Sequence, residues 1–167
     1  MQLVAVACLS LLFAGCDQQE STRPAGERLT VTQVSDGDTI TGVDQEGERI
    51  RVRLLGIDTP EVAHGDSSAE CGAMAARDSL RDLVLREEVT LVDDPRSDRV
   101  DRYGRRLAYV EAGGVDAGFH QVEGGWAEAW YPSGEPRPDR YDGYRRAERA
   151  AQKGHAGAWA TCPHLGR

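Results

Sequence analysis

The apolar positions of residues 29–40 predict a β-hairpin. They follow a period of two, with a slip of one residue in the middle, at Leu29, Val31, Val34 and Ile40. A period of two puts successive apolar side chains on one face of a strand. The Asp-Gly pair at 36–37 interrupts this pattern and is typical of a tight turn. We therefore expect two antiparallel strands joined at this pair.

A second alternating segment, residues 49–54, predicts a half-buried strand with a basic outer face. The apolar face consists of Ile50, Val52 and Leu54, and the other face of Arg49, Arg51 and Arg53. This alternation is the pattern of a strand with one face on the core. We interpret Arg49 and Arg51 as solvated side chains and keep Arg53 as a candidate for function.

Residues 67–86 change to helical spacing. The apolar residues fall three or four positions apart, at Ala69, Ala73, Ala76, Leu80 and Leu83. This stripe predicts an amphipathic helix that packs one face on the core. Ser67 and Glu70 have the spacing of a capping box, which predicts that the helix begins at residue 67. Cys71 lies beside the stripe, at the flank of the expected helix.

The remaining segments complete an α+β order. We expect strands at 89–92 and 107–110, a short helix at 115–123, a strand or turn at 126–131, and a last helix at 139–153. Gly154 follows the last helix as its expected C-cap. Strands followed mainly by helices indicate an α+β domain. The architecture that fits is a five-stranded OB-fold β-barrel with about three packed helices, a fold whose face commonly binds oligonucleotides.

The composition is that of one ordinary globular domain. The chain has 167 residues, of which 40% are hydrophobic and 29% are charged, and this balance excludes a disordered protein. The 20 basic residues stand against 28 acidic ones, so the formal net charge is -8. This sign excludes a protein that coats nucleic acid through its net charge. A site for a polyanion is therefore expected to be local.

The N-terminal segment predicts export. Residues 1–15 carry no charge and are mostly apolar. The run is too short to span a bilayer and matches the apolar region of a signal peptide. The small residues before Cys16 resemble a bacterial lipobox, in which this cysteine is lipidated and becomes the mature N-terminus. We therefore expect a signal peptide at 1–15, a tether at 16–27 and the folded domain at 28–167.

Two localisations follow from this segment. If Cys16 is lipidated, the protein is an exported lipoprotein that is anchored to a cell-envelope membrane through its N-terminal lipid. The alternative is a plain secretory signal, which leads to a secreted or periplasmic protein. The mature chain is exported in both cases.

The other cysteines predict a disulfide. Cys8 leaves with the signal peptide and Cys16 is the expected lipid site, so Cys71 and Cys162 remain. A pair of cysteines in an exported chain is typical of a disulfide. Zinc would need further ligands at short spacing, and only His164 lies near either cysteine. The sequence therefore favours a disulfide over a zinc site.

Four carboxylates at the ends of the predicted strands indicate a site for a hard cation. They are Asp36, Asp38, Asp58 and Glu61. Because no His or Cys stands beside them, the expected ion is calcium or magnesium. Each acidic motif alone is also typical of a turn. Only a fold that brings two strand ends together makes the two motifs one site.

The acidic motifs together with Arg53, and with Arg105 in the segment Asp-Arg-Tyr-Gly-Arg-Arg-Leu-Ala-Tyr, resemble the staphylococcal nuclease (thermonuclease) family. The resemblance covers residues 28–160. It implies that Asp38, Asp58 and the backbone carbonyl of Thr59 bind a calcium ion. It also implies that Asp36 acts on this ion through a bound water.

The resemblance implies roles for the remaining site residues. Glu61 would orient or deprotonate the attacking water, and Arg53 and Arg105 would bind the phosphoryl oxygens. Tyr103 would contact the terminal phosphate, and Tyr131 would support the base or sugar. The implied activity is calcium-dependent hydrolysis of DNA or RNA by a monomer, with low sequence specificity, single-stranded substrates and 3'-phosphate products.

Two other functions remain open at this point. One is a noncatalytic nucleic-acid-binding OB module, against which the joint presence of the acids and arginines speaks. The other is a lipoprotein adaptor for cell-envelope proteins, favoured only by the acidic net charge. In addition, Ser133 stands where the family has a second aromatic residue, which predicts weaker base stacking.

Overall fold

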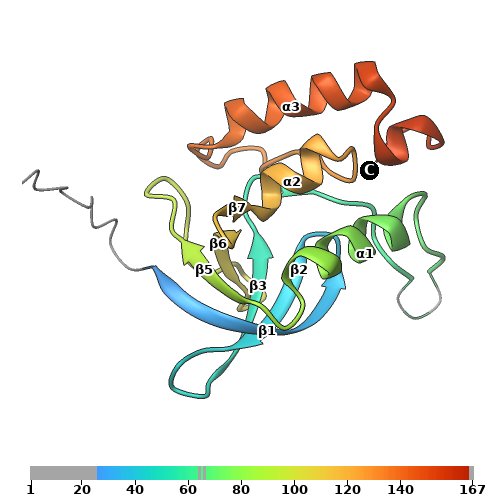
Figure 1. Ribbon diagram of the computed structural model, residues 1–167. Coiled ribbons are helices and arrows are strands. Elements are labelled where there is room, and N and C mark those ends of the chain that lie inside the picture. The colour runs from blue at the N-terminus through green and yellow to red at the C-terminus, as the bar shows by residue number, and fades with distance from the viewer. Residues whose placement is uncertain (1–25, 64, 66, 166–167) are drawn as a thin grey trace, which may run out of the picture.

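The computed structural model describes residues 26–63, 65 and 67–165 (Figure 1). The strands are β1 Glu27–Asp36, β2 Thr39–Val43, β3 Arg49–Leu54, β4 Ile57–Asp58, β5 Glu88–Val92, β6 Arg106–Ala112, β7 Val115–Asp116 and β8 Glu128–Ala129. The helices are α1 Ala73–Val84, α2 Ala117–Glu123, α3 Tyr141–Gly154 and the 3-10 turn η1 Gly157–Ala160. The signal peptide and the lipidation of Cys16 fall outside the described residues and stay predictions, as do the proposed domain boundaries.

Five strands close into a barrel, which confirms the predicted fold class. β1 pairs antiparallel with β2 and with β5, β2 pairs with β3, and β5 pairs with β6. A parallel pairing of β3 with β6 closes the ring. β7 extends the sheet beside β6, while β4 and β8 form a separate two-stranded sheet. The result is a mixed barrel with three helices packed beside it (Figure 1).

The slip in the alternation of β1 is a β-bulge. Val31 pairs with Gly42 and Gln33 pairs with Thr41, so one residue of β1 has no opposite residue in β2. A bulge bends a strand and increases its twist. β1 also pairs with β5 through residues 27–30. The bend therefore lets a single strand contribute to both sides of the closed barrel.

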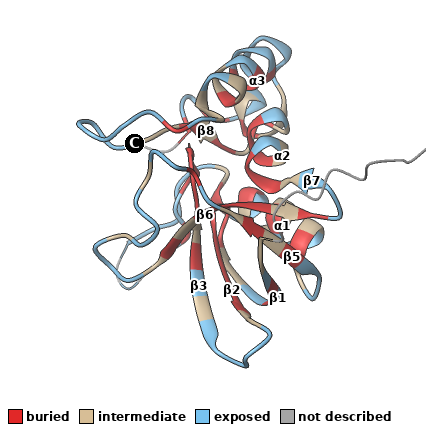
Figure 2. Cartoon of the chain, turned by 90° about the vertical axis from the view of Figure 1, so that its left-hand side faces the viewer, coloured by how far each residue is buried: buried red, intermediate tan, exposed pale blue. Residues whose placement is uncertain are grey.

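The apolar faces of the strands and helices meet in one core. The largest fully buried apolar side chains include Leu29, Ile40, Leu54, Ile57 and Leu80. Figure 2 shows that buried residues concentrate where the strands approach the helices, whereas the far end of the β2–β3 hairpin is exposed. The predicted apolar faces of β1 and β3 are thus confirmed, with the acidic strand ends lying at the helical side. No helix within residues 26–63, 65 and 67–165 is long and apolar enough to cross a membrane.

The predicted start of the first helix is wrong. α1 begins after Gly72, no side chain caps its N-terminus, and Ser67 and Glu70 do not form a capping box. Gly72 has a φ of 88°, and a Cβ added there would lie 2.8 Å from the Cβ of Ala158. A residue with positive φ does not continue a right-handed helix. The C-terminal segment that packs on Gly72 therefore sets where the helix begins.

The last helix ends one residue later than predicted. Gly154 is the final residue of α3, and His155 takes the left-handed C-cap conformation with a φ of 51°. The buried face of α3 includes Tyr144, Ala147 and Ala151, as the helical spacing predicts. The helix also begins two residues later than the predicted Asp139, at Tyr141, and its remaining span is confirmed.

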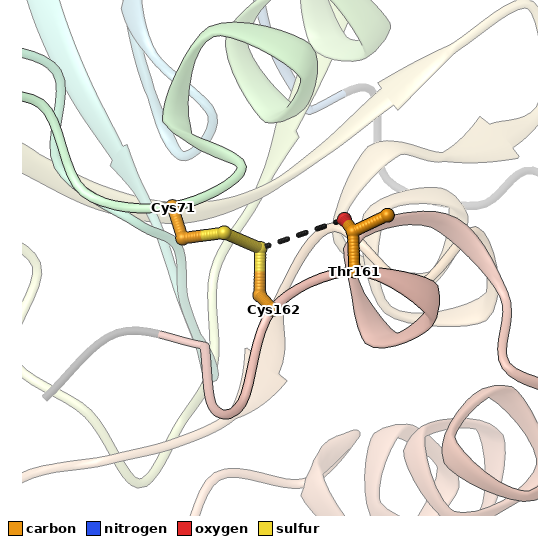
Figure 3. The surroundings of a disulfide bond; sticks show 3 residues. All are labelled: Cys71, Thr161 and Cys162. Carbon is orange, nitrogen blue, oxygen red and sulfur yellow. Dashed lines mark hydrogen bonds between the residues drawn. A yellow bond between two sulfur atoms is a disulfide. The ribbon is translucent and has the colours of Figure 1, made fainter.

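The predicted disulfide is present. Cys71 and Cys162 are bonded across a sequence separation of 91 residues. Figure 3 shows this bond joining the segment before α1 to the segment that follows η1. The bond therefore ties the C-terminal segment to the loop that leads from the acidic residues into α1.

Candidate active site

The turn between β1 and β2 positions the first pair of acidic residues. Asp36 pairs with Thr39 across the hairpin, and both Asp36 and Asp38 are buried. A Cβ added at Gly37 would lie 2.8 Å from the Cβ of Ala76 and 2.9 Å from Cγ2 of Thr59. Only glycine fits this approach without displacing backbone or a core residue. The turn is thus pressed between α1 and the second acidic motif.

Asp38 links the two acidic motifs. Its Oδ2 accepts hydrogen bonds from the backbone N–H of Thr59 over 3.1 Å and from the Thr59 hydroxyl over 2.9 Å. Its Oδ1 accepts from the hydroxyl of Thr39 over 2.9 Å. The structure therefore brings the two strand ends together, which is the condition for the two acidic motifs to form one site.

Arg53 lies between the two motifs. Its Nη2 is 3.1 Å from Oδ2 of Asp38 and 2.8 Å from Oδ1 of Asp58. Its Nη1 donates to the carbonyls of Leu54 and Ile57 over 2.8 and 2.9 Å. Both terminal nitrogens thus have acceptors within the protein, and the side chain is only 11% exposed. In this arrangement Arg53 brings a fixed positive charge to the site.

Gln121 supports the acidic turn through hydrogen bonds to the backbone. This side chain of α2 is fully buried, and its Nε2 donates to the carbonyls of Gly37 and Ala76, both over 2.8 Å. The two bonds join the turn to α1 through a third element. The sequence carries no signal for this role, because an isolated glutamine in a short helix has no distinctive spacing.

Glu61 lies beyond the second motif, at the edge of the site. Partial burial and the nearby charges of Asp38 and Asp36 raise the pKa of its carboxyl above the usual value, against the lowering effect of Arg53. The residue as a whole is exposed. The carboxylate is therefore subject to the negative charges of the buried acids while it remains open to water.

Arg105 comes from the loop between β5 and β6. Its Nε donates to Oδ2 of Asp101 over 2.7 Å, and its backbone N–H donates to Oδ1 of the same carboxylate over 2.9 Å. Burial alone would raise the pKa of Asp101, but the hydrogen bonds from Arg105 and from the backbone of Tyr103 lower it below the usual value. Asp101 therefore stays ionised and orients Arg105.

One open pocket of about 580 Å³ collects the predicted residues on the surface. Its lining includes Arg53, Asp58, Glu61, Tyr103, Arg105 and Tyr131. Tyr103 is 67% exposed, and Tyr131 is held edge-on against Tyr141 with 4.8 Å between the ring centroids. Asp36, Asp38 and Thr59 are buried and do not belong to this lining.

Two residues of the pocket wall are not among the site residues that the predicted strands and motifs indicate. Trp130 contributes to the lining, and its backbone N–H donates to the carbonyl of Gly56 over 2.9 Å. Asp101 also lines the pocket, where it holds Arg105. Its position four residues before the arginine is a signal that the sequence offered.

The donor set fits a single hard cation. Asp38 and Asp58 each approach the same cationic nitrogen, Nη2 of Arg53, within 3.1 Å, so both carboxylates reach one point of positive charge. All the donors are oxygens, as calcium and magnesium require. Within the residues that the structure describes, no three or more His, Cys, Asp or Glu side chains group as a metal site. A cation here would therefore need backbone carbonyls and water in addition to the two carboxylates.

Comparison with known proteins agrees with this geometry. Residues 51–161 match the family model described as staphylococcal nuclease homologue. The chain is 32% identical to the thermonuclease of Staphylococcus intermedius, over 94% of both chains. It is 31% identical to the thermonuclease of Staphylococcus hyicus, over 95% of this chain and 94% of the relative.

A third relative is the endonuclease YncB of Bacillus subtilis (strain 168), to which the chain is 32% identical over 82% of its own length and 64% of the relative. The region that matches the family model contains most of β3, the second acidic motif, Arg105 and α3. The barrel, the paired strand ends and these matches lead to one conclusion. The chain belongs to the staphylococcal nuclease family.

Proposed function

We propose that this protein is a nuclease that hydrolyses phosphodiester bonds of DNA or RNA with low sequence specificity. The observation that carries the proposal is the single pocket that combines Arg53, Arg105 and Glu61 with the carboxylate of Asp58. Membership of the staphylococcal nuclease family supports it, as do the relatives, which include a thermonuclease and an endonuclease. The pocket offers arginines and carboxylates that suit the phosphodiester group common to all sequences.

The two arginines provide the electrostatic part of the reaction. A phosphodiester is surrounded by negative charge, so a catalyst must neutralise the phosphoryl oxygens as charge develops on them. Asp101 bonds the Nε edge of Arg105, so the terminal nitrogens of this guanidinium are the edge that a phosphoryl group would meet. Arg53 adds a charge that the barrel holds in place.

Glu61 provides the base. Its carboxylate lies at the pocket and is open to water, as a group must be to orient and deprotonate an attacking water. The water oxygen bonds to phosphorus as its proton passes to a carboxylate oxygen of Glu61. The bond between phosphorus and the 5' oxygen breaks, and this oxygen takes a proton from solvent water, which leaves a 3'-phosphate and a 5'-hydroxyl.

A calcium ion is part of the proposal. Asp38 and Asp58 would hold it, together with the backbone carbonyl of Thr59, and Asp36 would act through a bound water. When bound, such an ion supplies additional neutralisation of a phosphoryl oxygen. The protein's own groups remain the ones that bind, orient and move the proton.

One experiment tests the activity and its cation together. Purified protein is incubated with single-stranded DNA and RNA at mildly alkaline pH, in calcium or in EGTA, and the product ends are identified. We expect cleavage only in calcium, with 3'-phosphate ends. If neither polymer is cleaved in calcium while single strands still bind, the protein is a noncatalytic nucleic-acid-binding module.

Localisation belongs to the same proposal. We expect the nuclease to be exported and anchored through a lipid on Cys16, and to act as a monomer. The change Cys16→Ala should move the protein from the membrane fraction to the soluble fraction. A variant that stays in the membrane fraction would contradict the proposed lipid anchor.

A further inference from the structure

Two hydrogen bonds between Glu61 and Glu70 join the ends of the loop that follows Glu61. The backbone N–H of Glu61 donates to Oε2 of Glu70 over 2.8 Å. In return, the backbone N–H of Glu70 donates to the carbonyl of Glu61 over 3.0 Å. Both polar groups of the Glu61 backbone are thus engaged by one residue. Because Oε2 belongs to a carboxylate, the first bond is charge-assisted and stronger than a neutral one.

Glu70 is anchored through the residues that follow it. Cys71 is bonded to Cys162 (Figure 3), and Gly72 packs tightly against Ala158. Behind this contact lies a small apolar cluster formed by Ala158, Cys162 and Leu165, with Trp126 and Trp159 packed against it. The C-terminal segment therefore acts as a fixed support for the end of the loop at Glu70.

This arrangement differs from an ordinary surface carboxylate. Glu70 is exposed, and exposed charged side chains usually contribute little to stability. Its carboxylate nevertheless bonds the backbone of Glu61, which lies beside the acidic motif. The contact therefore affects the position of the backbone from which the Glu61 side chain extends.

We propose that Glu70 is a positioning residue for Glu61, and that the Cys71–Cys162 disulfide holds Glu70 in place. The inference rests on the proposed function, in which Glu61 activates the attacking water. A general base works only within hydrogen-bond reach of the proton that it takes. A displacement of about 1 Å at such a group costs up to about 100-fold in rate.

The test compares Glu70→Ala with Glu70→Gln. The alanine variant has no acceptor for the Glu61 N–H, so we expect kcat to fall by about 10- to 100-fold with KM nearly unchanged. The glutamine variant keeps a side-chain carbonyl at the same reach and should regain most of the rate. A loss of overall stability would instead lower the unfolding temperatures of both variants. The glutamine variant would then not regain its rate.

Hydrogen exchange of the Glu61 amide, measured by NMR, gives a readout that does not depend on activity. The amide should exchange faster in Glu70→Ala and in the double variant Cys71→Ser/Cys162→Ser, and should stay protected in Glu70→Gln. Glu46→Ala, at an exposed carboxylate in the β2–β3 turn, is the matched control and should change neither quantity.

The outcomes separate this inference from the proposed function. If the wild type cleaves and Glu70→Ala keeps both its kcat and its amide protection, the positioning role is wrong and the nuclease stands. If the wild type does not cleave, the proposed function fails, and the exchange measurement alone decides whether Glu70 holds Glu61. Unchanged exchange in Glu70→Ala overturns the inference in either case.

Discussion

Two arginines face the same pocket from supports of different kinds. Arg53 is at the end of β3, where the carboxylate of Asp58 and two carbonyls accept from its terminal nitrogens. The carboxylate of Asp38 forms a second ion pair with it, and the side chain is 11% exposed. Arg105 is on the loop before β6, where one carboxylate four residues earlier holds it and its side chain is 23% exposed. One arginine is tied to residues on both sides of the barrel opening, and the other only to its own loop.

The two supports suggest that the arginines contribute differently to the stability of the fold and to catalysis. The charge of Arg53 offsets the buried carboxylates of Asp38 and Asp58, so we expect the stability of the fold to depend on it. The partner of Arg105 is local, so this side chain can be removed without exposing or stranding a distant group. A comparison of variants at the two positions therefore distinguishes a residue that builds the site from one that serves the reaction.

The largest effect is expected for Arg53→Ala. The change removes the guanidinium that lies within 3.1 Å of the buried carboxylates of Asp38 and Asp58, which should lower the free energy of unfolding by about 3 to 5 kcal/mol and abolish most of the activity. Urea denaturation measures the first quantity. Adding Asp38→Asn to the variant should recover part of the stability, because one of the buried negative charges is removed. A loss below about 1 kcal/mol, the scale of an exposed ion pair, would show that the barrel does not depend on this charge.

The next effect is expected for Arg105→Ala. Removal of one group that stabilises developing charge lowers a rate by about 100-fold or more, whereas the free energy of unfolding should change by less than about 1 kcal/mol. Initial rates of DNA cleavage and urea denaturation give the two values. Arg99→Ala is the control, because Arg99 is an exposed arginine of the same loop, paired with Asp93. Equal rates in the two variants would contradict the role of Arg105.

A smaller, pH-dependent effect is expected for Asp101→Asn. The lowered pKa of Asp101 means that its ionised form stabilises the fold above the ordinary value of 3.8, and that this contribution is lost as the pH falls through the folded value. At neutral pH the variant should be less stable by about 1 kcal/mol and should cleave more slowly, because Arg105 is less ordered. The stability curves of wild type and variant should converge in acid. Parallel curves down to the lowest pH would count against the interaction.

The smallest effect is expected for Arg51→Ala. Arg51 is exposed on the same strand as Arg53, and surface substitutions of this kind usually change stability by less than about 0.5 kcal/mol. Cleavage rate and unfolding free energy should both stay at the wild-type values. A large loss of activity would show that the basic outer face of β3 contributes to substrate binding.

The sequence predicted the elements that carry regular patterns. Alternation located β1 and β3, including the bulge before Val34, because a strand with one buried face must alternate. The chemistry of the site was also readable, since Asp38, Asp58, Glu61 and the two arginines stand in recognisable motifs. The structure gathers Asp58, Glu61 and both arginines in one pocket, with Asp38 buried and paired with Arg53.

The failures have a common cause. Ser67 and Glu70 have the spacing of a capping box, yet Glu70 instead accepts from Glu61. Gln121 shows no pattern, yet it supports the acidic turn across 84 residues of sequence. In each case a polar side chain has a partner from a segment that is not its helical or strand neighbour.

The sequence by itself therefore determined the five strands of the barrel, the buried faces of β1 and β3, the cysteine pair and the identity of the acids and arginines. These features follow from local periodicity and from residue chemistry. The sequence did not predict β4 or β7, and the residues of β7 fall at the start of the segment that was expected to be helical. Only the tertiary structure decided where α1 begins, which acceptors surround Arg53, and that Glu70 engages the backbone of Glu61. Hydrogen bonds are directional and short, so their partners are known only when the packing of distant segments has fixed the positions of the backbone atoms.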